Sequence, residues 1–213
     1  MYLPKHFEQS DPAALAALMR QHPLATIVRS SADGFAADPV PLLYDAADGA
    51  HGLLRGHVAR ANPLWREADG QPVLAIFSGP QAYVSPSWYP SKSATAKVVP
   101  TWNYAVVHAH GRLRAIDDAA WLRAFVERLT GTQEGRRAHP WAVSDAPADY
   151  IDTMLRAIVG FEIELVRLDA KWKVSQNRSA TDRLGVVAGL GAEPGDEARA
   201  MAELVRSEGR VSG

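Results

Sequence analysis

Hydrophobic residues recur at helical spacing in four stretches of this chain. An Asp-Pro pair at 11–12 supplies an N-cap followed by a first-turn proline, and the apolar residues after it predict a helix that ends near residue 22. Amphipathic spacing also predicts helices at about 117–129 and 148–159. A last helix, at about 194–207, has few apolar residues and is expected to be peripheral.

The other apolar segments have the length and residue types of β-strands. Pro39 and Pro41 cannot donate hydrogen bonds to a ladder, so the segment that contains them is expected at an edge of a sheet. Six or seven strands with helices inserted late in the chain are typical of a mainly β, α+β fold built around a β-barrel. The predicted strands are 24–28, 36–44, 53–60, a fully buried strand 72–78 that continues as 82–85, 98–116 and 161–166.

The composition is that of a globular protein, because 47% of the 213 residues are hydrophobic and 22% are charged. We expect one domain at 1–190, with inserted helices at about 117–159, followed by a peripheral helix and tail at 191–213. The absence of cysteine excludes disulfides, thiolate catalysis and cysteine-bound metal. No signal peptide or membrane span is recognisable, so we expect a cytoplasmic protein without membrane contact.

Three segments place charged, amide or aromatic side chains where a strand should be partly buried. They are residues 56–63, 99–108 and 171–179. Polar groups at such positions need partners, and a ligand with an anionic part and a flat aromatic part would provide them. The sequence contains no dinucleotide glycine fingerprint, no phosphate-binding P-loop and no nucleophile-elbow serine.

Arg60 and Asn62 lie where a strand leads into a short helix that starts near Pro63. An arginine can bind phosphate through two hydrogen bonds, and the first turn of a helix favours anions. The alternative is that Arg60 pairs with a surface carboxylate and Asn62 only caps the helix. The sequence leaves both interpretations open.

The strand that follows residue 98 has two different faces. Asn103 and the small residues at alternate positions after it are expected to face the barrel interior. Trp102 and the larger side chains at alternate positions after it are expected to lie against a ligand or another subunit. His108 and His110 point the same way and could bind a metal, but the sequence offers no third ligand nearby, so we predict no metal site.

Two further groups of side chains could contact a ligand. A loop at 83–89 carries aromatic and hydroxyl side chains that could cover a flat ring or complete the core beneath the loop. The last strand ends in basic and amide side chains that could bind an anion or form a solvated strand end. These candidates are Tyr83, Ser85, Trp88 and Tyr89 in the loop, and Lys171, Lys173, Gln176, Asn177 and Arg178 at the strand end.

Six motifs along the chain are shared with a known family. They are the opening MYLP, HVARANP at 57–63, YVSPSWY at 83–89, VPTWNY at 99–104, AIVGFEI at 157–163 and KWKVSQN at 171–177. Taken in this order, they resemble the PaiB family of FMN-binding negative transcriptional regulators. The resemblance runs collinearly from residue 1 to about residue 190, and several of the motifs are long and unusual.

This resemblance implies a split β-barrel of the pyridoxamine-phosphate-oxidase-like kind, with inserted and peripheral helices, that binds FMN at a homodimer interface. It implies that His57, Arg60 and Asn62 hold the phosphate, and that the strand end at 171–178 completes the site from the other subunit. No catalytic residue and no metal ligand follow from it. The candidate FMN-binding residues are His57, Ala59, Arg60, Asn62, Tyr83, Ser85, Trp88, Trp102, Asn103, Lys173, Gln176 and Arg178.

The resemblance also implies a negative transcriptional regulator, with DNA as a partner on that ground alone. The sequence has no helix-turn-helix pattern, and its net charge of -1 gives no general attraction to nucleic acid. The alternative is an FMN-dependent oxidoreductase, or a haem-binding relative that uses a histidine, without a direct role at DNA. We therefore predict an FMN-binding regulator and keep the enzyme as the second hypothesis.

Overall fold

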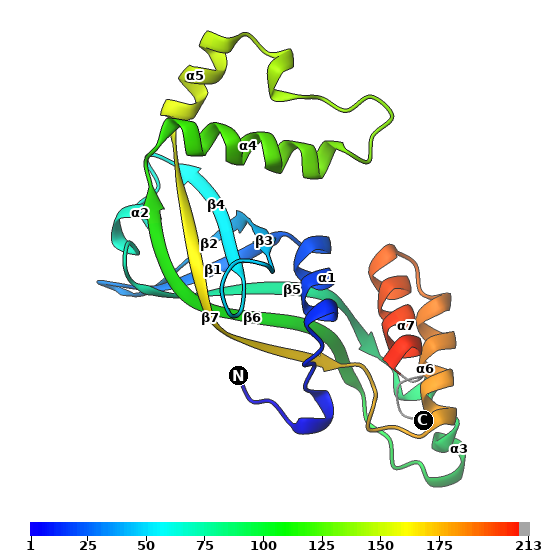
Figure 1. Ribbon diagram of the computed structural model, residues 1–213. Helices are drawn as coiled ribbons and strands as arrows, with labels where there is room; N and C mark the ends of the chain where they lie inside the picture. The colour runs from blue at the N-terminus through cyan, green and yellow to red at the C-terminus, as the bar shows by residue number, and fades with distance from the viewer. Residues whose placement is uncertain (209–213) are drawn as a thin grey trace. The chain divides into compact units, whose positions relative to one another are not determined.

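The computed structural model describes residues 1–208, so residues 209–213 of the predicted 191–213 tail lie outside the described part. Seven strands form one sheet in the order β2-β1-β5-β6-β7-β4-β3, and helices occupy several connections (Figure 1). The predicted α+β fold class is confirmed. The strands are β1 Leu24–Ser31, β2 Gly34–Pro41, β3 Leu43–Asp45, β4 Leu53–Ala59, β5 Pro72–Val84, β6 Thr101–Ile116 and β7 Ile158–Lys173. The helices are α1 Pro12–Gln21, α2 Leu64–Glu67, α3 Ser91–Thr95, α4 Ala119–Glu134, α5 Ala148–Arg156, α6 Ala180–Ala192 and α7 Asp196–Glu208, with short 3-10 helices η1 Lys5–Phe7, η2 Pro86–Trp88 and η3 Val143–Asp145.

The chain divides into two compact units. The first contains residues 1–18, 78–107 and those from 169 onward, and the second contains residues 19–77 and 108–168. β5, β6 and β7 contribute residues to both units, whereas the other four strands belong to the second unit. The second unit therefore holds the barrel and the inserted helices, and the first holds the C-terminal helices.

The two edges of the sheet meet in the second unit and close it into a barrel. β2 and β3 are the edge strands, yet only Leu42 separates them in the chain. An extended residue spans about 3.5 Å, so the two edges have to lie together. β2 also contacts β4, the neighbour of β3. Leu42 is buried at the closure, and its amide donates to the Pro23 carbonyl at 2.8 Å.

The prediction of one strand at 36–44 is wrong, because the segment forms two strands. β2 ends at Pro41, and β3 starts at Leu43 on the opposite edge of the sheet. The Leu42 amide bonds to a loop carbonyl and not to a ladder, which ends β2 at this point. The edge position expected from the two prolines is confirmed, because β2 pairs with β1 alone in the strand order.

The prediction of a fully buried strand at 72–78 is also wrong. From 73 to 79 the odd-numbered residues of β5 are buried, and the even-numbered ones are partly or fully exposed. β5 also continues without a break to Val84. In the first unit, Gly79 allows close packing at this point, since a β-carbon there would lie 2.7 Å from Leu18 Cδ1 and 3.2 Å from the Ala105 carbonyl oxygen.

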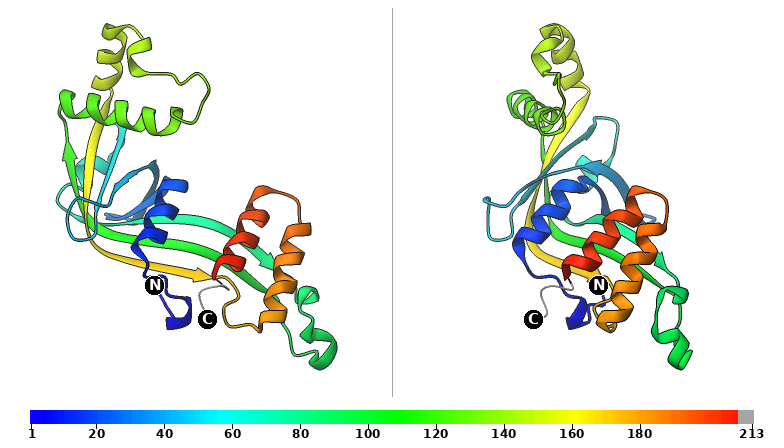
Figure 2. Two further views of the ribbon diagram at one scale, coloured as in Figure 1. Left: turned by 45° about the vertical axis from the view of Figure 1, so that its right-hand side comes forward. Right: turned by 90° about the vertical axis from the view of Figure 1, so that its right-hand side faces the viewer.

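The inserted helices α4 and α5 pack together in the second unit, as Figure 2 shows. Asp118 caps α4, because its carboxylate accepts from the Trp121 amide at 2.6 Å. The Trp121 ring stacks on Phe125 and lies over Gly160 of β7, where any β-carbon would overlap it. The predicted helices at 117–129 and 148–159 are thus confirmed. Their shared core consists of Leu122, Val143, Ile151 and Leu155.

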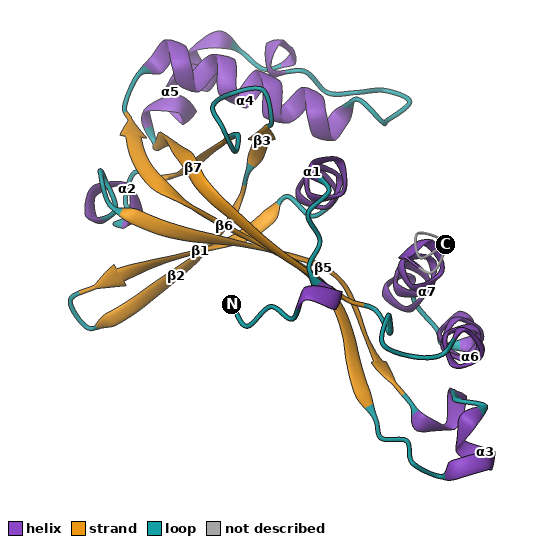
Figure 3. Ribbon diagram, turned by 60° about the horizontal axis from the view of Figure 1, so that its bottom comes forward, coloured by secondary structure: helices purple, strands orange, loops and turns teal. Residues whose placement is uncertain are grey.

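Helices α6 and α7 lie side by side in the first unit (Figure 3). The sequence analysis predicts no helix at 180–192, because three glycines and scattered alanines leave α6 without a clear apolar stripe. α7 is the predicted C-terminal helix, but Met201 and Val205 are fully buried, so one of its faces belongs to a core. The domain boundary near residue 190 stays a prediction. No helix within residues 1–208 is long and apolar enough to span a membrane.

Candidate functional site

Two lysines share one face at the end of β7 in the first unit. Lys171 is 7% exposed, and its ammonium donates to the Tyr2 carbonyl at 3.1 Å. The same ammonium lies 5.5 Å from the centre of the Tyr104 ring, within the range of a cation–π contact. Lys173 is half-buried and donates to the Thr101 hydroxyl and to the Trp102 carbonyl. Within the described residues, both ammonium groups therefore bond to neutral partners alone.

A third cation, Arg178, completes what we name the cationic strand end: Lys171, Lys173 and Arg178. Burial lowers the pKa of Lys173, and the positive charges of Lys171 and Arg178 lower it further. None of the three forms an ion pair with a carboxylate in the described part of the chain. The Asp182 carboxylate acts electrostatically on Arg178, whereas Lys171 and Lys173 have no carboxylate partner among residues 1–208. The two neighbouring lysines therefore favour the binding of an anion.

An aromatic surface adjoins this strand end in the same unit. Trp102 of β6 is 49% exposed and Tyr83 of β5 is 48% exposed, with ring centres 6.2 Å apart. The Trp102 indole donates to Gln81 at 3.2 Å, which fixes the ring. Lys173 bonds to the carbonyl of Trp102 itself, so the cations and the aromatic pair are adjacent. This arrangement offers stacking surface and positive charge together.

The turn after β7 is held by two amide side chains. Asn103 is 1% exposed and exchanges hydrogen bonds with the buried Ser175, at 3.0 and 3.3 Å. Ser175 has a φ of 67°, a left-handed conformation that costs energy in a residue other than glycine. Gln176 bridges the Trp172 carbonyl and the Val174 amide. Asn103 and Gln176 thus shape the strand end, and their predicted contact with FMN stays a prediction.

The aromatic loop, residues 83–89, borders the same cations. The Arg178 guanidinium lies 4.7 Å from the centre of the Tyr89 ring. Tyr89 is 2% exposed, and its hydroxyl has no hydrogen-bond partner among the described residues. Ser85 caps η2 by accepting from the Ser87 amide at 3.2 Å, which leaves its O–H group able to donate. The half-buried Trp88 follows in the same loop.

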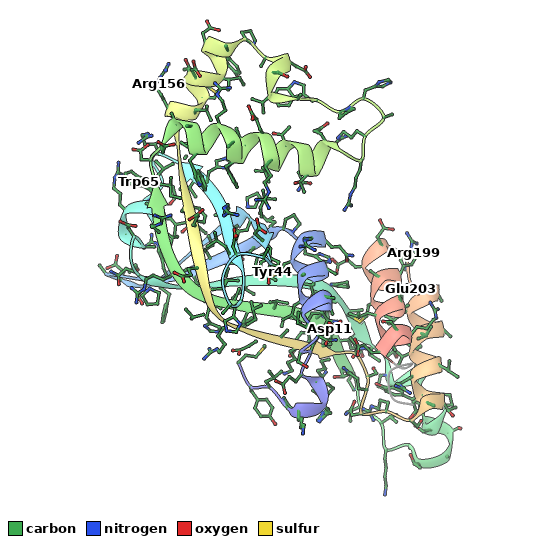
Figure 4. The ribbon with its side chains drawn as sticks, in the orientation of Figure 1. Asp11, Tyr44, Trp65, Arg156, Arg199 and Glu203 are labelled. Atoms are coloured by element: carbon green, nitrogen blue, oxygen red, sulfur yellow. The ribbon has the colours of Figure 1, made fainter. Side chains whose placement is uncertain are left out.

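Arg60 lies in the second unit, and four of its five side-chain N–H groups donate to oxygen atoms of the protein. Its guanidinium forms two hydrogen bonds with Asp117, at 2.6 and 2.7 Å. It also donates to the carbonyls of Ile158 and of Arg156, which Figure 4 labels at the end of α5. This is the carboxylate pairing that the sequence left open as the alternative. Phosphate binding by Arg60 stays a prediction, for which these bonds leave one N–H of Nη1.

A cavity of about 610 Å³ opens beside Arg60, with α4 and α5 contributing most of its lining. Two further arginines line it, but Arg123 pairs with Asp152 at 2.5 Å. The remaining one, Arg156, donates to the Thr153 hydroxyl. The positive charge of this cavity is therefore largely matched by carboxylates, unlike that of the cationic strand end.

His57 and Asn62 also have structural environments in the second unit. Asn62 accepts from the Leu64 amide at 2.8 Å and donates to Asp38 at 2.9 Å, as expected of a helix cap. His57 packs edge-on against Phe125, and burial lowers its pKa, so the imidazole is neutral near pH 7. Its Nδ1 atom is buried without a partner among the described residues. Ala59 is exposed at the end of β4.

The two faces of β6 agree with the sequence prediction. Asn103 and the small residues at alternate positions after it, up to Ala109, are buried. Trp102 is exposed, and the larger residues at alternate positions up to His110 are half-exposed. Within residues 1–208, no group of three or more histidine, aspartate or glutamate side chains could hold a metal ion.

A family model described as "Putative FMN-binding domain" matches residues 1–167 of this chain. The protein belongs to this FMN-binding family. It is 32% identical over 212 residues to protease synthase and sporulation protein PAI 2 of Bacillus subtilis, which covers 98% of each chain. It is also 32% identical over 247 residues to an uncharacterized protein of Emericella nidulans, covering 99% of this chain and 98% of that one. The predicted PaiB-type family is thus confirmed.

Two solved structures share the fold at low sequence identity. The FAD and heme binding protein of Mycobacterium smegmatis has a TM-score of 0.56 and 17% identity, over 78% of this chain and 72% of that one. The flavocytochrome Anf3 of Azotobacter vinelandii has a TM-score of 0.54 and 16% identity, over 81% of this chain and 72% of that one. The fold is therefore the split barrel of flavin-binding proteins. FMN, as predicted, is the cofactor of this FMN-binding family.

The residues of the first unit fit FMN. The cofactor has a phosphate with up to two negative charges and a flat isoalloxazine ring, and the cationic strand end and the Trp102–Tyr83 pair match these two parts. Most of this group is predicted from the sequence, but Lys171 is missing from the predicted FMN-binding residues. The signal for Lys171 is its spacing, since it lies two positions before Lys173 on the same face of a strand.

Proposed function

We propose that this protein is an FMN-binding regulator of the PaiB type, in which the cationic strand end holds the FMN phosphate. The observation that carries this proposal is that Lys171 and Lys173, next to the exposed Trp102, pair with no carboxylate among residues 1–208. A buried ammonium without a counter-charge is costly, and a bound phosphate supplies that charge. Membership of the FMN-binding family supports the choice of ligand.

Each residue would contribute in a different way. Two of the three ammonium protons of Lys173 are used inside the protein, so one remains for a phosphate oxygen. Lys171 and Arg178 add charge, and the Trp102–Tyr83 pair provides a flat apolar surface for the ring. Bound FMN would supply redox chemistry or a flavin-dependent signal, while the protein binds and orients it.

We extend the proposal to a homodimer and to the repression of transcription. Large aromatic side chains exposed to nearly half of their area favour association, which supports the dimer. The regulatory role is supported by the motifs shared with the PaiB family and by the identity to the Bacillus relative. In this proposal the flavin-bound dimer is the form that acts on DNA, in the cytoplasm.

FMN titrations of the Trp102→Ala variant test the flavin site. Loss of one stacking contact should weaken FMN and riboflavin alike, by about two- to tenfold. Trp141→Ala is the matched control, because Trp141 is also exposed, at 46%, but lies in the second unit. If Trp102→Ala binds flavin with unchanged affinity, or if Trp102→Ala and Trp141→Ala lose the same amount of affinity, the aromatic surface is not part of the flavin site.

A gel-shift titration tests the regulatory part. We expect the FMN-bound protein to retain DNA from its own promoter, and the flavin-free protein to retain it less. Anaerobic mixing with a nicotinamide donor is the companion measurement. Rapid multiple-turnover bleaching of the flavin, together with no DNA retention, would replace the regulator by the oxidoreductase.

A further inference from the structure

Two glycines of α6 lie directly against Trp88 of the aromatic loop. A β-carbon at Gly189 would overlap three atoms of the Trp88 indole ring. A β-carbon at Gly185, one turn earlier, would overlap the carbonyl oxygen of Trp88. The indole and its backbone therefore pack onto α6 at a distance that only glycine permits at both positions.

A second attachment joins the loop to the same helix. The Asp182 carboxylate accepts from the Ser91 amide at 3.1 Å and from the Ser91 hydroxyl at 2.9 Å. The hydrogen bond from the Ser91 amide is the largest cause of the lowered pKa of Asp182, so the carboxylate is ionised and a strong acceptor. Asp182 is 6% exposed, in the first turn of α6. Both ends of the segment 88–91 are thereby fixed to one helix.

The segment fixed in this way contacts the proposed FMN site. Tyr89 follows Trp88 directly and lies beneath the Arg178 guanidinium, which belongs to the cationic strand end. Helix α6 follows Arg178 by two residues, with Ser179 as its N-cap. The helix and the loop therefore meet at the cation that the proposal assigns to the phosphate.

We infer that α6 positions the aromatic loop for flavin binding, with Gly185, Gly189 and Asp182 as positioning residues. The inference rests on the proposed FMN site. It extends that site to α6, which, like the cationic strand end, lies outside residues 1–167, the part of the chain that matches the FMN-binding family model. A change on the side of α6 that meets Trp88 should move Trp88 and alter the flavin environment without removing any group that touches FMN.

The Gly189→Ala variant tests this inference, with Gly191→Ala as the matched control. Both substitutions replace a glycine of α6 by alanine, so both gain the same helix propensity, but a β-carbon at Gly191 has nothing within 4 Å. We expect Gly189→Ala to weaken FMN and riboflavin by about two- to tenfold and to change the visible circular dichroism of bound FMN. Gly191→Ala should leave both measurements unchanged.

A flavin-independent measurement separates this inference from the proposed function. With 5-fluorotryptophan incorporated, the Trp88 resonance in the fluorine NMR spectrum of the flavin-free protein should shift in Gly189→Ala and not in Gly191→Ala. In a Trp88→Ala background, Gly189→Ala should add no further loss of FMN affinity, because the two changes act on one contact. If Gly189→Ala does not fold, Ser91→Ala should weaken FMN binding, because it removes one hydrogen bond between the loop and Asp182 without changing the charge near Arg178.

The outcomes are distinguishable. A shifted Trp88 resonance with unchanged FMN affinity would show that α6 holds the loop but that the loop is not part of the site, which overturns the inference. Equal behaviour of Gly189→Ala and Gly191→Ala overturns it as well. FMN binding that is insensitive to Trp102 and to Lys173 would instead remove the proposed site, whatever happens at Trp88.

Discussion

Replacing Lys173 with methionine removes one positive charge from the cationic strand end while keeping the length of the side chain. The Lys173 ammonium donates to the Thr101 hydroxyl and the Trp102 carbonyl, so one proton remains for a phosphate oxygen. A hydrogen bond to a charged group contributes about 1.5–3 kcal/mol. Lys173→Met should therefore weaken FMN about ten- to 150-fold.

Riboflavin provides the internal reference for this experiment, because it carries the same ring without the phosphate. Its affinity should change by less than about twofold in Lys173→Met, unless the substitution disturbs the ring surface. Lys173→Arg keeps the charge and should retain most of the preference for FMN over riboflavin. The assay is a fluorescence titration of both flavins with each variant at fixed ionic strength.

Arg60→Gln tests the competing assignment, in which the motifs shared with the PaiB family place the phosphate at Arg60. The Arg60 guanidinium already binds Asp117 and two backbone carbonyls, so we expect its loss to leave the FMN-to-riboflavin ratio unchanged. If Arg60→Gln removes the preference for FMN and Lys173→Met does not, the reasoning from unpaired cations is refuted. The phosphate then belongs to the second unit.

Three further predictions concern pH and packing. FMN affinity should fall as the pH rises toward 10.5, the ordinary pKa of lysine, because the lowered pKa of Lys173 makes it lose its proton below that value. FMN titrations at a series of pH values check this, and the fall should be absent in Lys173→Arg. Because burial lowers the pKa of His57, the unfolded chain binds a proton below pH 6.5 that the folded chain does not. The free energy of unfolding measured with urea should therefore decrease as the pH falls below 6.5, and it should decrease less steeply in His57→Gln. Gly160→Ala should destabilise the protein by about 1–3 kcal/mol, because the new methyl group overlaps Trp121, whereas Gly131→Ala, with nothing within 4 Å of the added carbon, should not.

Sequence periodicity was sufficient for most of the fold. The alternation of small and large residues in β6 predicts which face is buried, because a strand alternates strictly and barrel interiors favour small side chains. The same approach fails at α6, where glycines that pack against Trp88 replace the apolar residues that would mark a helix. It also fails at Leu42, since one residue between two strands leaves no turn signal in the sequence.

The candidate site could be predicted in its residue types but not in its pairings. Arg60 pairs with Asp117, 57 positions further along the chain, and the sequence around Arg60 does not indicate that partner. The lysines at the end of β7 are visible in the sequence, but only the folded structure shows that no carboxylate in its described part, up to Glu208, pairs with them. The long-range pair of Arg60 with Asp117 is therefore the reason why we propose the strand end, and not the segment around Arg60, as the phosphate site.

The pairing of β4 with β7, which completes the barrel, has a consequence for how this protein folds during synthesis. Every rung between β4 and β7 joins residues about a hundred positions apart, from Leu53 with Glu164 to Ala59 with Ile158. During synthesis the strands β1 to β6 leave the ribosome before the strand that completes the ring, and the edge of β4 that β7 later covers has no partner until then. Barrels with such distant pairings fold slowly, so the nascent chain exposes an unpaired edge for as long as the last strand is missing.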